Sequence, residues 1–149
     1  MSKKNHHKIL TEKLLQYLAS TYALYLKTQN FHWNVTGSAF FVLHSFFEKQ
    51  YQELAEAIDL IAEQIRTFEI LIPGTFKQFS RLSKVKDALG KRTAKKMISQ
   101  LLADHLLMEE LTKDLITIAK DYQNDYVQDM SINRLKWHEK TIWMLRSYG

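Results

Sequence analysis

The sequence contains no cysteine, one proline and only four glycines among its 149 residues. Without cysteine the chain can form neither a disulfide nor a thiolate metal site. The scarcity of proline and glycine leaves few points at which a helix would have to break. No run of about 20 apolar residues is present and the N-terminus leads into no apolar signal core, so we expect a cytoplasmic protein with no membrane segment.

Apolar residues recur every three or four positions between residues 38 and 66, which predicts one long amphipathic helix. The members of this apolar stripe are Phe40, Leu43, Phe47, Tyr51, Leu54, Ile58, Ile61 and Ile65. Further helices are expected at residues 8–33, 76–82, 93–122 and 125–147, the last with Asn124 as its N-cap. The sequence therefore predicts an all-α four-helix bundle, with a short extra helix in the long connection between the second and third long helices.

The helix at residues 38–66 carries two pairs of metal-ligating side chains, His44 with Glu48 and Asp59 with Glu63. Residues four apart are neighbours on a helix surface, so the members of each pair lie together. All four side chains lie on one flank of the helix, because the eleven residues from Glu48 to Asp59 make about three full helical turns. The two pairs are nevertheless about 16 Å apart along the axis. Metal–ligand bonds of about 2 Å cannot bridge that distance.

One metal ion therefore cannot use both pairs of a single chain. Either each chain carries two half-built sites, or a second copy supplies the missing pair. An antiparallel copy across a two-fold axis would bring His44 and Glu48 opposite Asp59 and Glu63 of the partner subunit, giving two equivalent sites. The geometry favours such an intersubunit site, although the spacing alone also fits the solvated flank of an amphipathic helix.

His32 lies between Phe31 and Trp33 at the end of the first predicted long helix. Its side chain is expected to point inward, because the residues on its helical face are largely apolar or aromatic. A lone inward histidine is more often a hydrogen-bonded core residue than a metal ligand. The pattern alone therefore leaves both roles open.

Four stretches of the sequence match one family closely: Asn30–Gly37 (NFHWNVTG), Phe40–His44 (FFVLH), Gln50–Arg66 (QYQELAEAIDLIAEQIR) and His138–Arg146 (HEKTIWMLR). They resemble the Dps proteins, the dodecameric mini-ferritins. The resemblance covers nearly the whole chain, and the His-Trp-Asn segment followed by Asp-x-x-x-Glu is highly specific. It implies a ferritin-like four-helix bundle in which the second and third long helices run parallel.

The resemblance also implies a ferroxidase centre between two-fold related subunits. Its ligand positions correspond here to His32, His44, Glu48, Asp59 and Glu63. The family most often has Asp where this chain has Glu48, so the longer side chain should shift the metal or alter its affinity. Trp33, beside a ligand, is either an electron donor when only one iron is bound or an interfacial packing residue. The Glu-x-x-His pairs that larger ferritins use within one bundle are absent.

Iron is the substrate that this resemblance implies. Fe(II) would be oxidised, in this family often by hydrogen peroxide, and Fe(III) mineral would be stored inside a homododecamer, which protects DNA from oxidative damage. The mixed nitrogen and oxygen ligands also suit zinc or manganese. A rival interpretation is a metal-buffering or structural shell that holds zinc and does not turn over.

Positive charge in this chain of net charge +5 gathers in two places. Residues 1–7 are expected to form a flexible basic tail before a domain of residues 8–149, with Lys3, Lys4 and Lys8 at or beside that tail. The segment 81–96 holds seven cations against one acid. A solvated connection explains these charges, but twelve copies would also attract phosphate in a salt-dependent way.

Some Dps proteins bind DNA through N-terminal lysines, so we expect DNA binding without sequence specificity, and association with the nucleoid. A protein that uses only this basic surface, without enzymatic activity, is the alternative function. Asp125 and Asp129 lie one turn apart at the start of the last helix. They complement the helix dipole, and by resemblance they would line three-fold pores that concentrate cations.

Overall fold

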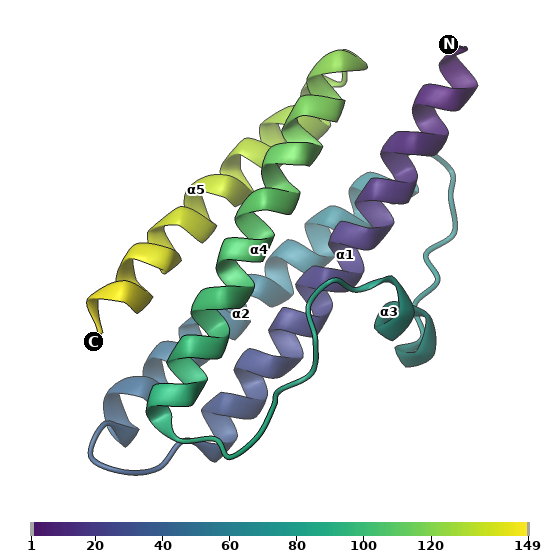
Figure 1. Cartoon of the computed structure of the whole chain (residues 1–149). Coiled ribbons are helices and arrows are strands. Elements are labelled where there is room, and N and C mark those ends of the chain that lie inside the picture. Colours follow the sequence, from purple (N-terminus) through teal and green to yellow (C-terminus); the bar gives the residue numbers. More distant parts are fainter. Residues whose placement is uncertain (1, 149) are drawn as a thin grey trace.

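The computed structural model describes residues 2–148, so Met1 and Gly149, the outer limits of the predicted tail and domain, lie outside the described residues. Four long helices form the bundle in Figure 1: α1 (Lys3–Asn34), α2 (Phe40–Arg66), α4 (Ala94–Asp121) and α5 (Asp125–Ser147). The short helix α3 (Phe76–Leu82) lies in the connection between α2 and α4. Residues 2–148 contain no strand. The predicted all-α ferritin-like bundle, with its short extra helix, is confirmed.

The long connection determines the direction of the helices. α2 runs antiparallel to α1, and α5 runs antiparallel to α4 (Figure 1). Between these pairs the chain crosses from one end of the bundle to the other, so that α2 and α4 run parallel, as expected. α1 packs against α2, α4 and α3, which places the connection over the outside of α1.

Side-chain caps begin three of the five helices. Thr75, Thr93 and Asn124 each accept a hydrogen bond from the backbone N–H three residues further on. Each bond satisfies a backbone donor that has no partner within the first helical turn. The turn between α1 and α2 contains Gly37 with a φ of 98°, a left-handed conformation that glycine adopts without steric cost.

The first turn of α1 differs from the sequence prediction. α1 begins at Lys3 and not at Lys8, so residues 3–7, expected to be part of a flexible tail, are helical. The ring of His6 stacks on Tyr122 with centroids 4.2 Å apart. This contact with the end of α4 gives the early turns a packing partner, which the polar sequence of the segment did not indicate.

The core combines an apolar interior with a layer of buried polar groups. In α2 the predicted stripe supplies Leu43, Phe47, Leu54, Ile61 and Ile65, all buried. The middle turns of all four long helices add polar residues, which form the pairs Arg134 with Glu53, His105 with His138, and Tyr17 with Thr112. Within residues 2–148, none of the helices combines the length and the apolar character that a membrane crossing would require.

Candidate metal centre

The last turn of α1 and the first turns of α2 bring His32 and His44 into contact. Their rings stack with centroids 3.9 Å apart and an interplanar angle of 16°. The Nδ1 atom of each ring lies 2.8 Å from the backbone carbonyl oxygen of the other histidine. Because a carbonyl oxygen can only accept, both Nδ1 atoms carry hydrogen and donate.

This arrangement is one in which histidines of other proteins commonly bind metal ions. A neutral imidazole that donates from Nδ1 keeps its lone pair on Nε2. Metal-binding histidines commonly donate their other ring N–H to a backbone carbonyl in this way, which holds the ring and its tautomer in place. His32 is buried, with 7% of its surface exposed, so its predicted inward orientation is confirmed. His44 is half-buried.

The three carboxylates stand along α2 without ion-pair partners. Glu48 lies one helical turn after His44 and is half-buried, whereas Asp59 and Glu63 are exposed. None of the three belongs to an ion pair in the part of the chain that the structure describes. Their charges are therefore available to a cation brought to this flank of the helix.

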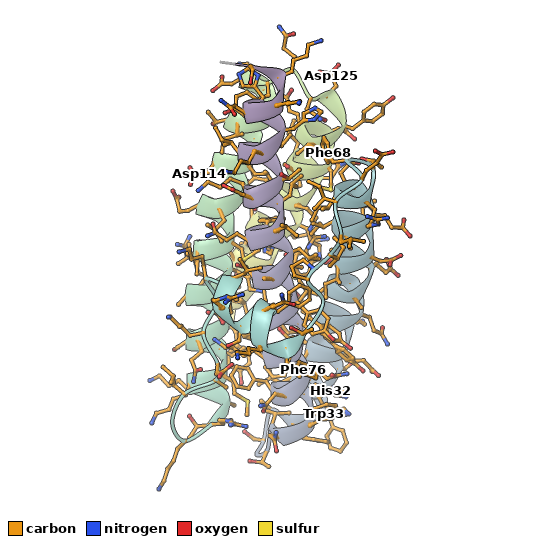
Figure 2. The ribbon with its side chains drawn as sticks, turned by 90° about the vertical axis from the view of Figure 1, so that its right-hand side faces the viewer. His32, Trp33, Phe68, Phe76, Asp114 and Asp125 are labelled. Carbon is orange, nitrogen blue, oxygen red and sulfur yellow. The ribbon has the colours of Figure 1, made fainter. Side chains whose placement is uncertain are left out.

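The two groups of ligands lie far apart in one chain. α2 is continuous from Phe40 to Arg66, so Glu48 and Asp59 are separated by about 16 Å along its axis. Figure 2 shows His32 near one end of the bundle and Phe68, two residues beyond α2, near the other. Among residues 2–148, no three His, Cys, Asp or Glu side chains gather closely enough to hold a metal ion.

One chain thus offers two incomplete sites. We refer to His32, His44 and Glu48 as the histidine half-site, and to Asp59 and Glu63 as the carboxylate half-site. The structure brings His32 and His44 into contact, with Glu48 one helical turn after His44, and keeps Asp59 and Glu63 in the last turns of α2. Neither half-site alone supplies the four or more ligands that a metal centre of this kind requires.

Two aromatic residues that the sequence pattern assigned only to the apolar stripe pack on the histidines. The ring of Phe40 stacks on His44 at a centroid distance of 4.9 Å, and the ring of Tyr51 lies 5.2 Å from that of His32. Phe40 and Tyr51 lie four residues before and seven residues after His44 on the same helix. The register along α2 places Phe40 one turn from His44, but only the packing of α1 on α2 brings Tyr51 to His32.

Trp33 lies differently from its neighbour in the sequence. Its side chain is 61% exposed, and within residues 2–148 no ring contact joins it to His32 or His44. Figure 2 places Trp33 beside His32 at the end of α1. Its large exposed surface fits the interfacial packing role that the sequence left open.

The other charged residues singled out from the sequence are at the surface. Asp125 and Asp129 are exposed on the first turns of α5, and Asp125 lies at the end of the bundle opposite His32 (Figure 2). Lys3, Lys4 and Lys8 are exposed on the first turns of α1. The seven cations of segment 81–96 are also exposed, and within the described residues none forms an ion pair.

Comparisons with known proteins identify the family of the chain. A family model of the ferritin-like domain matches residues 11–148. The DNA protection during starvation protein 2 of Bacillus anthracis is 32% identical over 142 residues, which span 95% of this chain and 97% of that protein. The general stress protein 20U of Bacillus subtilis is 32% identical over 143 residues, 93% of this chain and 99% of its own. The chain belongs to the Dps family of ferritin-like proteins.

Solved structures of Dps proteins share the whole bundle with this chain. The crystal structure of Dps from Staphylococcus aureus superposes with a TM-score of 0.90 at 32% identity and covers 93% of each chain. That of a Dps protein from Bacillus brevis gives a TM-score of 0.93 at 28% identity and covers 97% of each. The Dps resemblance seen in the sequence is thus confirmed over nearly the full length of the chain.

Proposed function

We propose that this Dps-family protein oxidises Fe(II) at centres shared by two subunits and stores the Fe(III) product inside a dodecameric shell. The observation that carries the proposal is the pair of imidazoles held by reciprocal hydrogen bonds from Nδ1, the arrangement that leaves Nε2 as the ring nitrogen for a metal ion. Glu48 lies one turn away, and the complementary carboxylates lie too far along the same helix to complete the site. A two-fold related copy would supply them.

Exposed apolar side chains on the surface of the chain support its assembly with other subunits. Large apolar side chains remain exposed on several elements, among them Phe41 of α2 at 84%, Phe76 of α3 at 80% and Trp143 of α5 at 63%. Exposed apolar patches commonly mark surfaces that another protein chain covers. Their distribution over different helices suits a subunit with neighbours on more than one side.

In the proposed reaction iron is the substrate and hydrogen peroxide the oxidant. Two Fe(II) ions give one electron each to one molecule of hydrogen peroxide, which is reduced to two hydroxide ions, so that no hydroxyl radical is released. The histidine half-site of one subunit and the carboxylate half-site of its partner bind and orient the two ions. Zinc or manganese would fit the same nitrogen and oxygen ligands.

Entry of iron is assigned to the first turns of α5. Asp125 and Asp129 are exposed and free of ion pairs within residues 2–148. Three copies around a three-fold pore would concentrate cations by focusing the electrostatic field. This role is part of the proposal and requires that the chain assemble into the dodecameric shell.

DNA is the proposed partner of the basic surface, with the cytoplasmic nucleoid as its location. The relatives named for DNA protection during starvation suggest this partner. Lys3, Lys4 and Lys8 lie on the exposed first turns of α1, before or at the start of the ferritin-like unit that we propose for residues 8–149. Binding through phosphates alone would be independent of base sequence and would weaken with salt.

Anaerobic loading with Fe(II), followed by hydrogen peroxide and measurement of ferric absorbance, tests the enzymatic proposal. Wild type should oxidise Fe(II) faster than buffer, and the double variant His32→Ala with Glu63→Ala should fall to the buffer rate. Glu56→Gln, an exposed change on the same helix, should retain the wild-type rate and serves as the control. Oxidation by the double variant at the wild-type rate would contradict the proposal.

The two rival functions predict different results for Fe(II) oxidation and for DNA retardation. A zinc-holding shell without turnover predicts that wild type is no faster than buffer. A non-enzymatic nucleoid protein predicts the same, together with retardation of DNA that diminishes from low to moderate salt. Replacing Lys3, Lys4 and Lys8 by Gln should weaken the retardation, and its absence at every salt concentration would remove DNA as a partner.

A further inference from the structure

A cavity of about 430 Å³ lies between α1, α3 and the connection that follows α3. Figure 2 shows this side of the bundle, with α3 in front of α1. The volume falls within the range of about 300–1,000 Å³ that is typical of small-molecule sites. None of the five half-site residues lines this space, which we call the α3 cavity. The proposed metal centre therefore does not account for it.

Aromatic side chains form one wall of the α3 cavity. Tyr22 of α1 and Phe79 of α3 both line it, with ring centroids 5.3 Å apart, and both are half-buried. Phe76, at the start of α3, lines the same cavity and is 80% exposed. Exposed apolar surface of this kind commonly marks a place that a ligand or partner covers. The wall is suited to the flat face of an aromatic ligand.

Cations without a counterion form another part of the lining. Lys86 and Arg92 line the cavity, both are exposed, and neither belongs to an ion pair within residues 2–148. Arg92 donates from Nη1 to Oδ1 of Asn30 at 2.7 Å, which holds the guanidinium beside α1 without neutralising it. Lys27 also lines the cavity, but its Nζ pairs with Asp104 at 2.8 Å and adds no net charge.

The remaining polar groups narrow the chemistry of the ligand. A ligand that matches an aromatic wall and two free cations has a flat ring and an anionic group. Asp87 is the acid of the lining that has no ion pair within the described residues, and its carboxylate can only accept hydrogen bonds. A simple aromatic carboxylate offers it no donor. A nucleotide does, through its sugar hydroxyls or a base amino group, and its phosphate fits the fork of an arginine.

We propose that the α3 cavity binds a nucleotide, with the base against Tyr22 and Phe79 and the phosphate at Lys86 and Arg92. This arrangement, an aromatic platform beside cations, is the one by which proteins commonly hold unpaired nucleotides. The nucleotide is either a free molecule or an unpaired nucleotide of single-stranded DNA, because both present the same base and phosphate. The site lies apart from both half-sites, so the inference does not depend on Fe(II) oxidation.

Calorimetric titration of the assembled wild type with adenosine monophosphate (AMP), adenosine and inorganic phosphate, at low salt, tests the proposal. AMP should bind with one molecule per chain. Adenosine and phosphate should each bind at least about tenfold more weakly, because the first lacks the contacts with the cations and the second lacks stacking. Native mass measured on the same samples shows that the protein is assembled.

Three variants identify the parts of the cavity that hold the ligand. Arg92→Gln should weaken AMP binding by about tenfold and leave adenosine binding unchanged, since it removes a charged contact at the surface. Phe79→Leu should weaken both by about tenfold through the loss of stacking. Lys95→Gln, a change to an exposed cation of segment 81–96 that does not line the cavity, should bind AMP as wild type does. Circular dichroism shows that each variant is folded.

Competition distinguishes the two sources of the nucleotide. If a single-stranded oligothymidylate displaces AMP and a duplex of equal length does not, the cavity receives unpaired DNA. If neither displaces AMP, the ligand is a free nucleotide. If the duplex displaces AMP as well as the single strand does, the cavity recognises phosphate alone and the proposed base contact is wrong.

Other results would also overturn the proposal. These are no binding of AMP to the assembled wild type, equal affinity for phosphate and AMP, or equal loss of binding in Arg92→Gln and Lys95→Gln. Fe(II) oxidation at the half-sites would be unaffected by any of them, because the residues concerned are different. Conversely, wild type that binds AMP but oxidises no Fe(II) would retain this site and lose the ferroxidase proposal.

Discussion

At the residue scale, two side chains that are equally buried can have different roles because their hydrogen-bond partners differ. His32 and His138 are both buried. His32 donates from Nδ1 to the backbone carbonyl of His44, whereas His138 shares its Nδ1 with that of His105 at 2.9 Å, and its buried Nε2 has no hydrogen-bond partner among the described residues. The first arrangement suits a metal ligand at the edge of the bundle. The second belongs to the polar layer of the core.

The ion pair between Glu53 and Arg134 provides a prediction at this scale. The Arg134 side chain is only 6% exposed, so removing the partner charge leaves a guanidinium uncompensated in the core. We expect Glu53→Gln to lower the free energy of unfolding by about 3 kcal/mol, near the low end for a buried pair because Glu53 itself is partly exposed. Urea denaturation measures this difference.

Glu56→Gln is the matched control for that measurement. Glu56 lies one turn further along α2 and is exposed, so its replacement should change stability by no more than about 0.5 kcal/mol. Equal denaturation midpoints for the two variants would show that the pair with Arg134 contributes nothing measurable.

At the element scale, helix boundaries follow the local sequence closely wherever a cap or an apolar stripe is present. α3 and α5 have the predicted bounds, and the Asn124 side chain accepts from the backbone N–H of Val127 as its predicted N-cap role requires. The start of α1 departs from prediction because its first turns are stabilised by contact with Tyr122, at the end of α4. A contact between elements so distant in sequence leaves no local signal.

The contact between α4 and α5 through His105 and His138 predicts how stability depends on pH. Burial, with a further contribution from the charge of Arg134, lowers the pKa of His105 to about 3. Burial likewise lowers the pKa of His138 well below its usual value of 6.5, with the charges of His105 and Arg134 adding to the effect. Below pH 6.5 the unfolded chain therefore takes up protons that the folded chain does not accept.

We expect stability to be independent of these two histidines above pH 6.5 and to fall as the pH decreases below it. His105 alone should contribute a slope of about 1.4 kcal/mol per pH unit until its folded-state pKa is approached. Denaturation of wild type and His105→Gln between pH 7.5 and 4, at equal protein concentration, measures the difference in slope. His7→Gln, an exposed change on α1, should leave the slope unchanged, and an equally unchanged slope in His105→Gln would refute the assignment.

At the scale of the whole molecule, the two half-sites lie too far apart on α2 for a single chain to complete a centre. This separation allows the proposed centre to be tested by mixing variants. In a pair formed from one His32→Ala subunit and one Glu63→Ala subunit, one centre carries both changes and the other carries neither. If each centre were built within one chain, mixing the two variants would produce no intact centre.

Unfolding and refolding the two variants together in equal amounts should restore activity that each lacks alone. Random association makes half of the pairs mixed, and each mixed pair has one intact centre of two, so about a quarter of the wild-type rate is expected. The measurement is Fe(II) oxidation by peroxide after native mass has shown a common assembly. No recovery above the separate variants would exclude a centre shared across a two-fold axis.

The sequence by itself determined the helices, the spacing of the ligands and the Dps family. These features depend on local periodicity, on residues a fixed rise apart along one helix and on motifs within short stretches of chain. Helical geometry alone was enough to show that the two ligand pairs of residues 38–66 cannot share a metal ion. It could not show that the inward-pointing ring of His32 packs against that of His44.

Only the tertiary structure decided which residues from separate helices meet. The reciprocal bonds of His32 and His44, the contact of Tyr51 with His32 and the buried pair of His105 with His138 all join different elements. Such contacts depend on how the helices pack around the core, and the residues involved carry no shared periodicity that would reveal them. Tertiary packing thus determined which ring nitrogens donate to backbone carbonyls and which histidines remain neutral in the core.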